Sequence, residues 1–195
     1  MDIKKIIKKI LCPIQCIRFG IHSHKDNLYI GKACKIVNAK LMEFGKNVSI
    51  MPYTMLVCHG NESKIFFDDG VEIGMYSRIA AQSEVILEKN VLTGPHIFIA
   101  DYNHEYQDIY KAIKFQGNMI KPTQEFPRGG VRIGEGTWIG TNVVIAGTIK
   151  IGKQCVIGAN SVVTKDIPDY SVAVGSPCKV IRKYNLETQK WENVN

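Results

Sequence analysis

The chain contains no uninterrupted run of eighteen or more apolar residues, although 45% of its 195 residues are hydrophobic. A helix that crosses a bilayer needs about 20 such residues, so the sequence predicts no membrane span. Lysines recur every few positions near the start, which argues against the apolar stretch of a secretory signal. The length suits one compact domain with a sizeable core.

Metal and disulfide patterns are missing too. The six cysteines form no Cys-x-x-Cys pair and have no His/Cys spacing typical of a metal site; they are Cys12, Cys16, Cys34, Cys58, Cys155 and Cys178. Scattered cysteines of this kind behave as small apolar residues in a reduced compartment. We therefore expect a cytoplasmic protein without a metal cofactor.

A dense Lys/Arg block is lacking, although the net charge is +7. The basic residues are spread along the chain and do not alternate with aromatic residues, which argues against a nucleic-acid partner. A small polyanionic ligand explains the positive charge at least as well.

Residues 1–20 have an amphipathic helical pattern. One face carries apolar residues and the lysines lie mostly elsewhere; the apolar positions are Ile3, Ile6, Ile7, Ile10 and Ile14. We favour a helix that caps the open end of the core. Contact of this basic helix with an anionic membrane surface is the alternative.

The strongest feature is a period of six residues. From position 133, every sixth residue is Ile or Val, and the next residue is small; these anchor positions are Ile133, Ile139, Ile145, Ile151, Ile157 and Val163. An upstream run repeats the apolar period of six with Phe67, Ile73, Ile79, Val85, Val91 and Ile97. Since residues two apart in a strand face the same side, each anchor of the run from 133 and the uncharged residue two before it should point inward.

Short, equal strands that turn every six residues predict an all-β solenoid, with three sides per coil forming a triangular prism. An antiparallel sandwich would need longer strands and hairpin signals such as Asn-Gly, which these runs lack. A right-handed parallel β-helix would have longer and less regular coils.

The segment 131–182, VRIGEGTWIGTNVVIAGTIKIGKQCVIGANSVVTKDIPDYSVAVGSPCKVIR, resembles the C-terminal half of the hexapeptide-repeat acetyltransferases. It is most similar to the galactoside, maltose and polysaccharide O-acetyltransferase branch, and the resemblance covers roughly residues 65–182. It implies a left-handed parallel β-helix over residues 21–182, with an extended loop at about 100–130. Residues 183–195 would form a C-terminal tail, with a short helix that closes one end.

The interruption between Ile97 and Ile133 contains His104, flanked by Asp101, Asn103 and Glu105. Long insertions in regular scaffolds usually carry function. Acetyl transfer to an alcohol requires removal of the hydroxyl proton, for which a neutral imidazole is suited. In the resembled family a histidine on such a loop is the catalytic base, which implies that role for His104. Asp101 or Glu105 is a candidate to orient the imidazole, and a backbone carbonyl would serve equally well.

The resemblance also implies a binding surface for acetyl-CoA along the last coils, between two subunits of a homotrimer. The matching positions are Thr141, Ala159, Thr164, Lys165 and Arg182. Trp138 should project outward and, by resemblance, line the acceptor site. Two departures from the family pattern are Ala146-Gly147-Thr148, where a proline commonly precedes the glycine, and Pro168-Asp169 in place of Pro-Pro.

The sequence therefore favours an O-acetyltransferase that moves an acetyl group from acetyl-CoA to a hydroxyl of a sugar or polysaccharide precursor. N-acetylation of an amino sugar nucleotide and acetylation of a xenobiotic are alternatives within the same fold. A scaffold without activity is the non-enzymatic alternative. A zinc site like that of a carbonic anhydrase would need three suitably spaced histidines, and the five histidines are not so placed.

Overall fold

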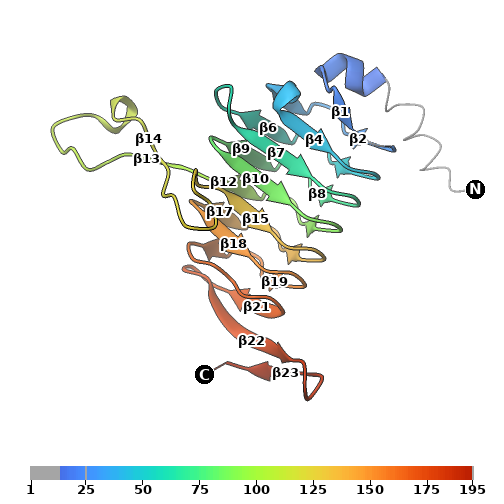
Figure 1. The fold of residues 1–195 in the computed structure, drawn as a ribbon, viewed down its shortest axis with the longest axis vertical. Coiled ribbons are helices and arrows are strands. Elements are labelled where there is room, and N and C mark those ends of the chain that lie inside the picture. Colours follow the sequence, from blue (N-terminus) through green and yellow to red (C-terminus); the bar gives the residue numbers. More distant parts are fainter. Residues whose placement is uncertain (1–13, 25, 195) are drawn as a thin grey trace, which may run out of the picture.

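In the computed structural model, which describes residues 14–24 and 26–194, the chain winds into a three-sided prism of parallel strands (Figure 1). Each coil adds one strand to each of three sheets, in the repeating order sheet B, sheet C, sheet A. Three edges result, which we call the A/B, B/C and C/A edges after the sheets that meet there. The predicted parallel β-helix is confirmed.

Sheet A consists of β1 (Ser23–His24), β4 (Met42–Phe44), β7 (Lys64–Phe67), β10 (Glu84–Leu87), β15 (Val131–Ile133) and β18 (Ile149–Ile151). Sheet C consists of β3 (Lys35–Val37), β6 (Met55–Cys58), β9 (Arg78–Ala81), β12 (Phe98–Ala100), β17 (Val144–Ala146) and β20 (Val162–Val163). Sheet B consists of β2 (Tyr29–Ile30), β5 (Ser49–Ile50), β8 (Glu72–Ile73), β11 (Leu92–Thr93), β16 (Trp138–Ile139), β19 (Val156–Ile157), β21 (Ser171–Val174), β22 (Lys179–Asn185) and β23 (Lys190–Asn193). A short 3-10 helix, η1 (Ala39–Leu41), lies between β3 and β4.

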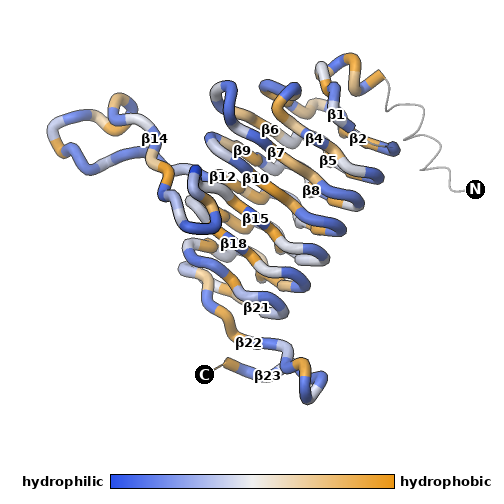
Figure 2. The backbone as a smooth tube through the Cα atoms, in the orientation of Figure 1, coloured by the Kyte–Doolittle hydropathy of each residue, from blue (hydrophilic) through white to orange (hydrophobic). Residues whose placement is uncertain are grey.

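The core is built from columns of side chains that stack from coil to coil. In sheet C, for example, Ile79 pairs with Ile99, which pairs with Ile145. All anchors of the two predicted runs are buried, as are the residues two positions before each anchor of the second run. Along the tube in Figure 2, apolar and polar segments alternate accordingly. The inward pattern expected from the sequence is confirmed.

The period is not constant, however. In the second run Ile133 pairs with Ile151, 18 residues later, so three six-residue sides make a coil. In the first run Phe67 pairs with Leu87, 20 residues later. The two extra residues of this coil lie near the C/A edge. A strict count of six therefore falls on Val85, two positions before Leu87, which is the residue that pairs with Phe67. The expectation of six-residue sides throughout is wrong there, and the pattern survives because both positions face inward.

Two of the edges turn through a residue with positive φ. Asparagine is frequent at these corners, with φ of 57–60° at Asn47, Asn90, Asn142 and Asn160. Because asparagine tolerates the left-handed region better than other residues with a side chain, these corners are formed at low cost. The corners of the C/A edge are less uniform, and this edge carries the long insertion.

Polar residues at inward positions bond to backbone groups of neighbouring coils. The Thr137 hydroxyl donates to the Gly152 carbonyl at 2.8 Å and accepts the N–H of Cys155 at 3.0 Å. The Ser161 hydroxyl donates to the Gly158 carbonyl and accepts the N–H of Gly175. A buried hydroxyl that is hydrogen-bonded in this way costs little folding free energy, so these positions do not interrupt the core.

Residues 14–19 form a helix over the first coil. Cys16 is buried against the core, and the Gln15 amide bonds both the N–H and the carbonyl of Ile30 in β2. The amide thereby occupies backbone groups of the first strand of sheet B that another strand would pair with. This agrees with the predicted cap for the described part of the segment. Residues 1–13, on which the membrane alternative depends, lie outside the described residues.

The predicted short C-terminal helix is wrong. Residues of the tail form an antiparallel hairpin, in which β22 pairs with β21 and then with β23. The Asn185 side chain accepts the N–H groups of Glu187 and Thr188, which forms the turn. Tyr184 and Trp191 pack edge to face across the hairpin, 5.4 Å apart. Cross-strand aromatic packing and the turn favour this hairpin over the expected short helix.

No helix among the residues that the structure describes is long and apolar enough to cross a membrane.

Two neighbouring residues of β10 test the inward column directly. Leu87 is fully buried, whereas Ile86 faces outward and is half-buried. We expect Leu87→Ala to lower the free energy of unfolding by about 2–5 kcal/mol, because it removes packing and leaves a cavity. Ile86→Ala should cost clearly less. Urea denaturation of both variants provides the measurement, and equal losses would contradict the assigned strand faces.

Candidate active site

The chain leaves the prism at the C/A edge after β12 and returns at β15 (Figure 1). We call residues 102–130 the arm. Near its base β13 (Asn103–His104) pairs antiparallel with β14 (Asn118–Met119), and a 3-10 helix, η2 (Ile113–Phe115), lies towards its tip. Gln116 bonds Asp108 and the Lys111 carbonyl across the tip. The arm is therefore an ordered ribbon.

The return leg of the arm is fastened to the prism. Phe126 is buried, and the Arg128 guanidinium pairs with the Glu62 carboxylate at 2.8 Å. The Lys150 ammonium pairs with Glu125 at 2.6 Å. Both ion pairs are exposed, so we take the buried Phe126 as the main anchor of this leg.

His104 lies in β13 opposite Asn118, and its side chain is exposed. The imidazole meets the Tyr102 ring edge to face, with 6.4 Å between the ring centres. The Tyr102 hydroxyl lies 3.1 Å from Nε2 of His59, at the end of β6. The Asn118 amide donates to Gln82 Oε1 at 3.2 Å. Both legs of the base of the arm thus contact corner residues of the C/A edge.

Asp101 is fully buried directly before the arm. Its two carboxylate oxygens accept the N–H groups of Gln82 and Ser83, each at 2.7 Å. Burial raises the pKa of this carboxyl, and the backbone hydrogen bonds oppose that shift. The same charge contributes to the raised pKa of the Cys58 thiol, about 11, for which burial is the main cause.

Asp101 therefore closes the corner between β9 and β10. Its role as support for His104 remains a prediction, as does that of Glu105. The backbone N–H of Glu105 donates to the Gly117 carbonyl at 3.1 Å and holds the ribbon beyond β13.

A groove of about 380 Å³ lies between the base of the arm and the last coils at the C/A edge. Its walls come from three places: the arm with Asn103, Met119, Lys121 and Thr123, the corner with Ala146, Gly147, Thr148 and Ile149, and Thr164 of the next coil. Asn103 precedes His104, so the groove joins the neighbourhood of the candidate base to a candidate coenzyme residue.

The corner where the family commonly has a proline is intact. Gly147 has a φ of +106°, which favours glycine, and its N–H donates to the Ala100 carbonyl at 2.9 Å. An ideal Cβ on Gly147 would lie 3.7 Å from the Asn103 amide nitrogen. The departure at residues 146–148 thus leaves a narrow corner that forms the floor of the groove.

Four of the five predicted coenzyme residues lie at two different edges. Thr164 and Lys165 follow β20 at the C/A edge, on the same edge as the arm. Thr141 and Ala159 lie at the B/C edge, between sheets B and C. Arg182 is in β22 and donates to the Trp191 carbonyl at 3.3 Å. Sheet C separates the two groups within one chain.

Trp138 projects from sheet B and is 50% exposed, which confirms its predicted orientation. Other large apolar side chains are exposed on the same sheet or at the B/C edge; they are Tyr53, Met75, Tyr76 and Leu92. Tyr53, Tyr76 and His96 stack in a ladder with ring centres 4.9 and 5.1 Å apart. We call Tyr53, Met75, Tyr76, Leu92 and Trp138 the apolar patch.

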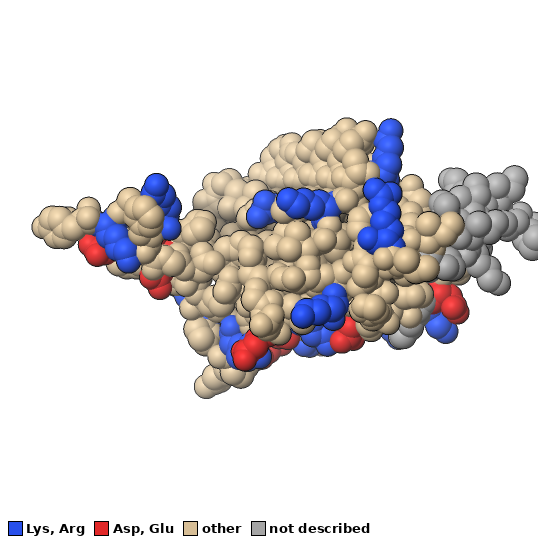
Figure 3. All heavy atoms as spheres, turned by 90° about the horizontal axis from the view of Figure 1, so that it is seen from above, with Lys and Arg blue, Asp and Glu red and all other residues tan. Residues whose placement is uncertain are grey.

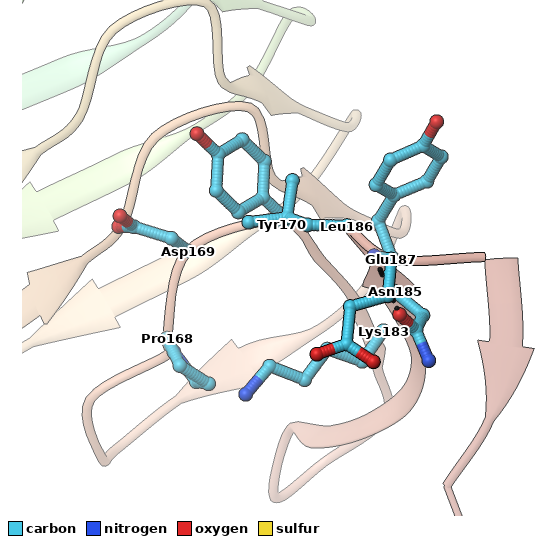
Figure 4. Close-up of a pocket in the computed structure, with 8 residues that line it drawn as sticks. Pro168, Asp169, Tyr170, Lys183, Asn185, Leu186 and Glu187 are labelled. Atoms are coloured by element: carbon cyan, nitrogen blue, oxygen red, sulfur yellow. Dashed lines mark hydrogen bonds between the residues drawn. The ribbon is translucent and has the colours of Figure 1, made fainter. Parts of the chain in front are cut away.

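A further groove of about 560 Å³ lies at the A/B edge, between the corner at residues 168–170 and the C-terminal hairpin (Figure 4). Tyr170 and Tyr184 line it, and Asp169, Lys183 and Glu187 bring charges of both signs. Because the charges are mixed, this groove does not form a cationic surface for phosphates.

Lysines and arginines form separate groups on the face shown in Figure 3, including a group on the arm. Among residues 14–24 and 26–194, no cluster of three or more His, Cys, Asp or Glu side chains is placed to hold a metal ion.

A three-sided prism of short parallel strands with a histidine-bearing arm at one edge agrees with the resemblance to the hexapeptide-repeat acetyltransferases. Residues 130–165 match the family model described as bacterial transferase hexapeptide, six repeats. Over 165 residues, 82% of this chain and 80% of the relative, the chain is 36% identical to the putative lipopolysaccharide biosynthesis O-acetyl transferase WbbJ of Escherichia coli (strain K12). The chain belongs to the hexapeptide-repeat acetyltransferases, and is an acyl-CoA-dependent acetyltransferase.

Two further proteins illustrate the similarity. The galactoside O-acetyltransferase of Lactococcus lactis subsp. lactis (strain IL1403) is 29% identical over 151 residues, 77% of this chain and 67% of the relative. The solved structure of a mutant of AntD, an N-acyltransferase from Bacillus cereus in complex with dTDP and coenzyme A, has a TM-score of 0.72 with 90% of both chains covered. Its sequence identity is 16%, so it supports the fold alone.

Sequence reasoning did not bring Tyr102 and His59 to the site. The two residues are 43 positions apart, and the spacing of the histidines contains no sign of the contact. The alignment of coils would have placed both in one column, because Leu56 pairs with Ile79 and Ile79 with Ile99. Each lies three residues after one of these inward positions.

The corner formed by Asp101 can be tested by Asp101→Asn. The amide retains one acceptor oxygen, so one of the two buried N–H groups loses its partner. We expect a loss of about 1–3 kcal/mol in the free energy of unfolding, measured by urea denaturation. Asp169→Asn is the control, since Asp169 is exposed and bonds the Lys153 N–H through Oδ1 alone. A loss at Asp101 no larger than at Asp169 would contradict this role.

Proposed function

We propose that this protein is an O-acetyltransferase that moves the acetyl group of acetyl-CoA to a hydroxyl of a sugar or polysaccharide precursor, with His104 as the general base. The observation that carries the proposal is the arm at the C/A edge, which presents an exposed histidine, His104, next to a groove lined by Asn103 and by Thr164 of the last coils. A donor that runs from the last coils along this groove would reach the base of the arm, where the imidazole of His104 is exposed on the other face of β13.

The proposed reaction is a direct transfer. The acceptor oxygen attacks the thioester carbonyl carbon while His104 takes the hydroxyl proton. The tetrahedral oxyanion then collapses, the C–S bond breaks, and the imidazolium returns the proton to the leaving thiolate. Backbone N–H groups at the glycine-rich corners are suitable donors to the oxyanion.

Coenzyme A carries a pyrophosphate and a 3′-phosphate, so its site needs cations and backbone donors. Lys165 is exposed beside Thr164, and Arg182 is exposed on β22. In the proposal these two side chains attract the phosphates, and the pantetheine arm runs along the narrow corners near Ala159 and Thr141 towards His104.

A second copy of the chain is needed to complete this site. The arm and Thr164 lie at the C/A edge, whereas Thr141, Ala159 and Trp138 lie at or near the B/C edge. The arm exposes large apolar side chains, whose contact with water is unfavourable; they are Tyr106, Ile109, Tyr110, Ile113 and Phe115. The apolar patch near the B/C edge is a suitable surface for them.

We infer that the arm of one copy reaches the B/C edge of the next. Because the two surfaces differ, the contact is head to tail and must close into a ring. Three prisms close such a ring in the proposed homotrimer, and each site then combines His104 of one copy with Trp138 of its neighbour.

The O-acetyl acceptor is supported by the names of the relatives, two of which are described as O-acetyltransferases. A hydroxyl also depends more strongly on a base than a free amine does, because a neutral amine is already nucleophilic. Cys34, Cys58, Cys155 and Cys178 are free thiols, in keeping with the proposed cytoplasmic location, where acetyl-CoA is available.

The His104→Ala variant should lower kcat by about 10²- to 10⁴-fold, because it removes the base, while the KM for acetyl-CoA changes little. Thiol release from acetyl-CoA in the presence of an active acceptor provides the readout. His22→Ala, which removes an exposed histidine on the first coil, is the control. Wild-type turnover in His104→Ala would overturn the assignment.

Mixing two inactive variants tests the shared site. His104→Ala lacks the base, and Ala159→Glu places bulk and negative charge at the B/C edge. In mixed trimers, sites that combine the intact arm of one copy with the intact edge of another should restore up to about a quarter of wild-type activity. If co-refolded mixtures of correctly assembled trimers stay inactive, each site lies within one copy.

The acceptor class is tested by a screen of sugars with hydroxyl groups alone and of amino sugar nucleotides, with acetyl-CoA as donor. We expect thiol release and a hydroxylamine-labile acetyl ester on a sugar hydroxyl. Acetylation of amines alone, which gives stable amides, would favour the N-acetyltransferase alternative. Absence of thiol release with every acceptor would favour a scaffold.

A further inference from the structure

The pair of Tyr102 and His59 lies at the base of the arm, in contact with the candidate base. The Tyr102 ring is edge to face with His59, 5.4 Å between centres, and edge to face with His104 on its other side, at 6.4 Å. Its hydroxyl lies 3.1 Å from His59 Nε2; which group donates depends on the tautomer of the histidine. One tyrosine thus connects the candidate base to a histidine of the prism.

The arm needs such a connection. β13 and β14 are two residues long each, their pairing partners lie within the arm, and His104 is exposed. A general base must be held to within a fraction of an ångström of its productive position, and a short exposed ribbon does not supply that precision alone. The support has to come from the rigid coils.

His59 is well placed to provide it. It follows β6, and its own N–H donates to the Ala81 carbonyl at 2.8 Å, so its backbone is part of the coil ladder. Tyr102 follows Asp101, whose carboxylate is bonded to the neighbouring corner. Both partners of the hydrogen bond therefore start from fixed backbone, and the ring of Tyr102 has little freedom between them.

We propose that Tyr102 and His59 are positioning residues for His104: their hydrogen bond holds the Tyr102 ring against the imidazole and sets the direction in which the arm leaves the prism. This proposal rests on the proposed role of His104. In the proposed reaction, neither Tyr102 nor His59 touches the reacting atoms. The pair acts on the rate of the chemical step and leaves binding of the donor largely unchanged.

A double-mutant cycle tests the pair. Tyr102→Phe keeps the ring and removes the hydroxyl, and His59→Ala removes the partner. Each should lower kcat by about ten- to a hundred-fold, with the KM for acetyl-CoA within about twofold of wild type. Since both changes break one hydrogen bond, the double variant should be no slower than the slower single variant. His59→Gln, whose amide can still bond the hydroxyl, should recover most of the rate.

Tyr170→Phe is the matched control, because it removes another tyrosine hydroxyl from a ring that contacts a basic side chain, the Lys153 ammonium 5.4 Å from the ring centre, at the distant A/B edge. It should leave kcat unchanged. Thermal midpoints of all variants within a few degrees of wild type would exclude general unfolding as the cause.

Three results would overturn the proposal: unchanged kcat in Tyr102→Phe, effects that multiply in the double variant, or no recovery in His59→Gln. These outcomes are distinct from failure of the proposed function. If wild-type protein is active and His104→Ala is not, the assignment of His104 as the base holds, whatever the Tyr102 variants show. If His104→Ala is fully active, both that assignment and the positioning role of Tyr102 and His59 are wrong.

Discussion

The parallel stacking of one coil on the next is the constraint on which the rest of the structure depends. Backbone ladders and columns of buried aliphatic side chains keep equivalent positions of successive coils in line, as Ile79, Ile99 and Ile145 are. Corner residues then also fall into columns along three edges. A solenoid of this kind converts a repeat in sequence into linear arrays on its surface.

The C/A edge uses this property. His59, Gln82 and Tyr102 follow equivalent strands, and Asp101 joins two of these coils through its carboxylate. The insertion therefore starts from a corner that is more firmly held than a typical loop. A rigid edge with an ordered arm separates two tasks in the proposed function: the coils set position, and the arm carries the proposed base and exposed apolar side chains that another copy would cover.

The edges also explain why a single prism is an incomplete enzyme in this account. The flat face of sheet C lies between the groove near Asn103 and the corner residues Thr141 and Ala159. The proposed assembly of several copies side by side would bring unlike edges together without any change in the fold. The exposed aromatic and aliphatic side chains of the arm would then be buried by the same contact that completes the site.

Much of this could be predicted from the sequence, because the anchors at Ile133 to Val163 follow a period that few folds share. The outward direction of Trp138 followed from the same alternation. The 20-residue coils could not be predicted, since Val85 and Leu87 are both apolar and both face inward. The C-terminal hairpin was missed because its turn depends on the Asn185 side chain and its strands on pairing with β21.

For the candidate site, the contacts between coils were the main feature that could not be predicted from the sequence. Asp101 stands close to His104 in sequence, yet its carboxylate points to the N–H groups of Gln82 and Ser83. His59 stands far from it in sequence and lies against Tyr102. Local sequence therefore indicated the candidate segment, and the register of the coils decided which of its side chains meet.

A crystal structure with coenzyme A and a sugar acceptor bound tests the central claim most directly. The account predicts three prisms around a threefold axis, with the thiol between His104 of one copy and the B/C edge of the next, and the acceptor hydroxyl within hydrogen-bond distance of the imidazole. A coenzyme bound wholly within one prism, or a thiol far from His104 with the acceptor in place, would contradict it.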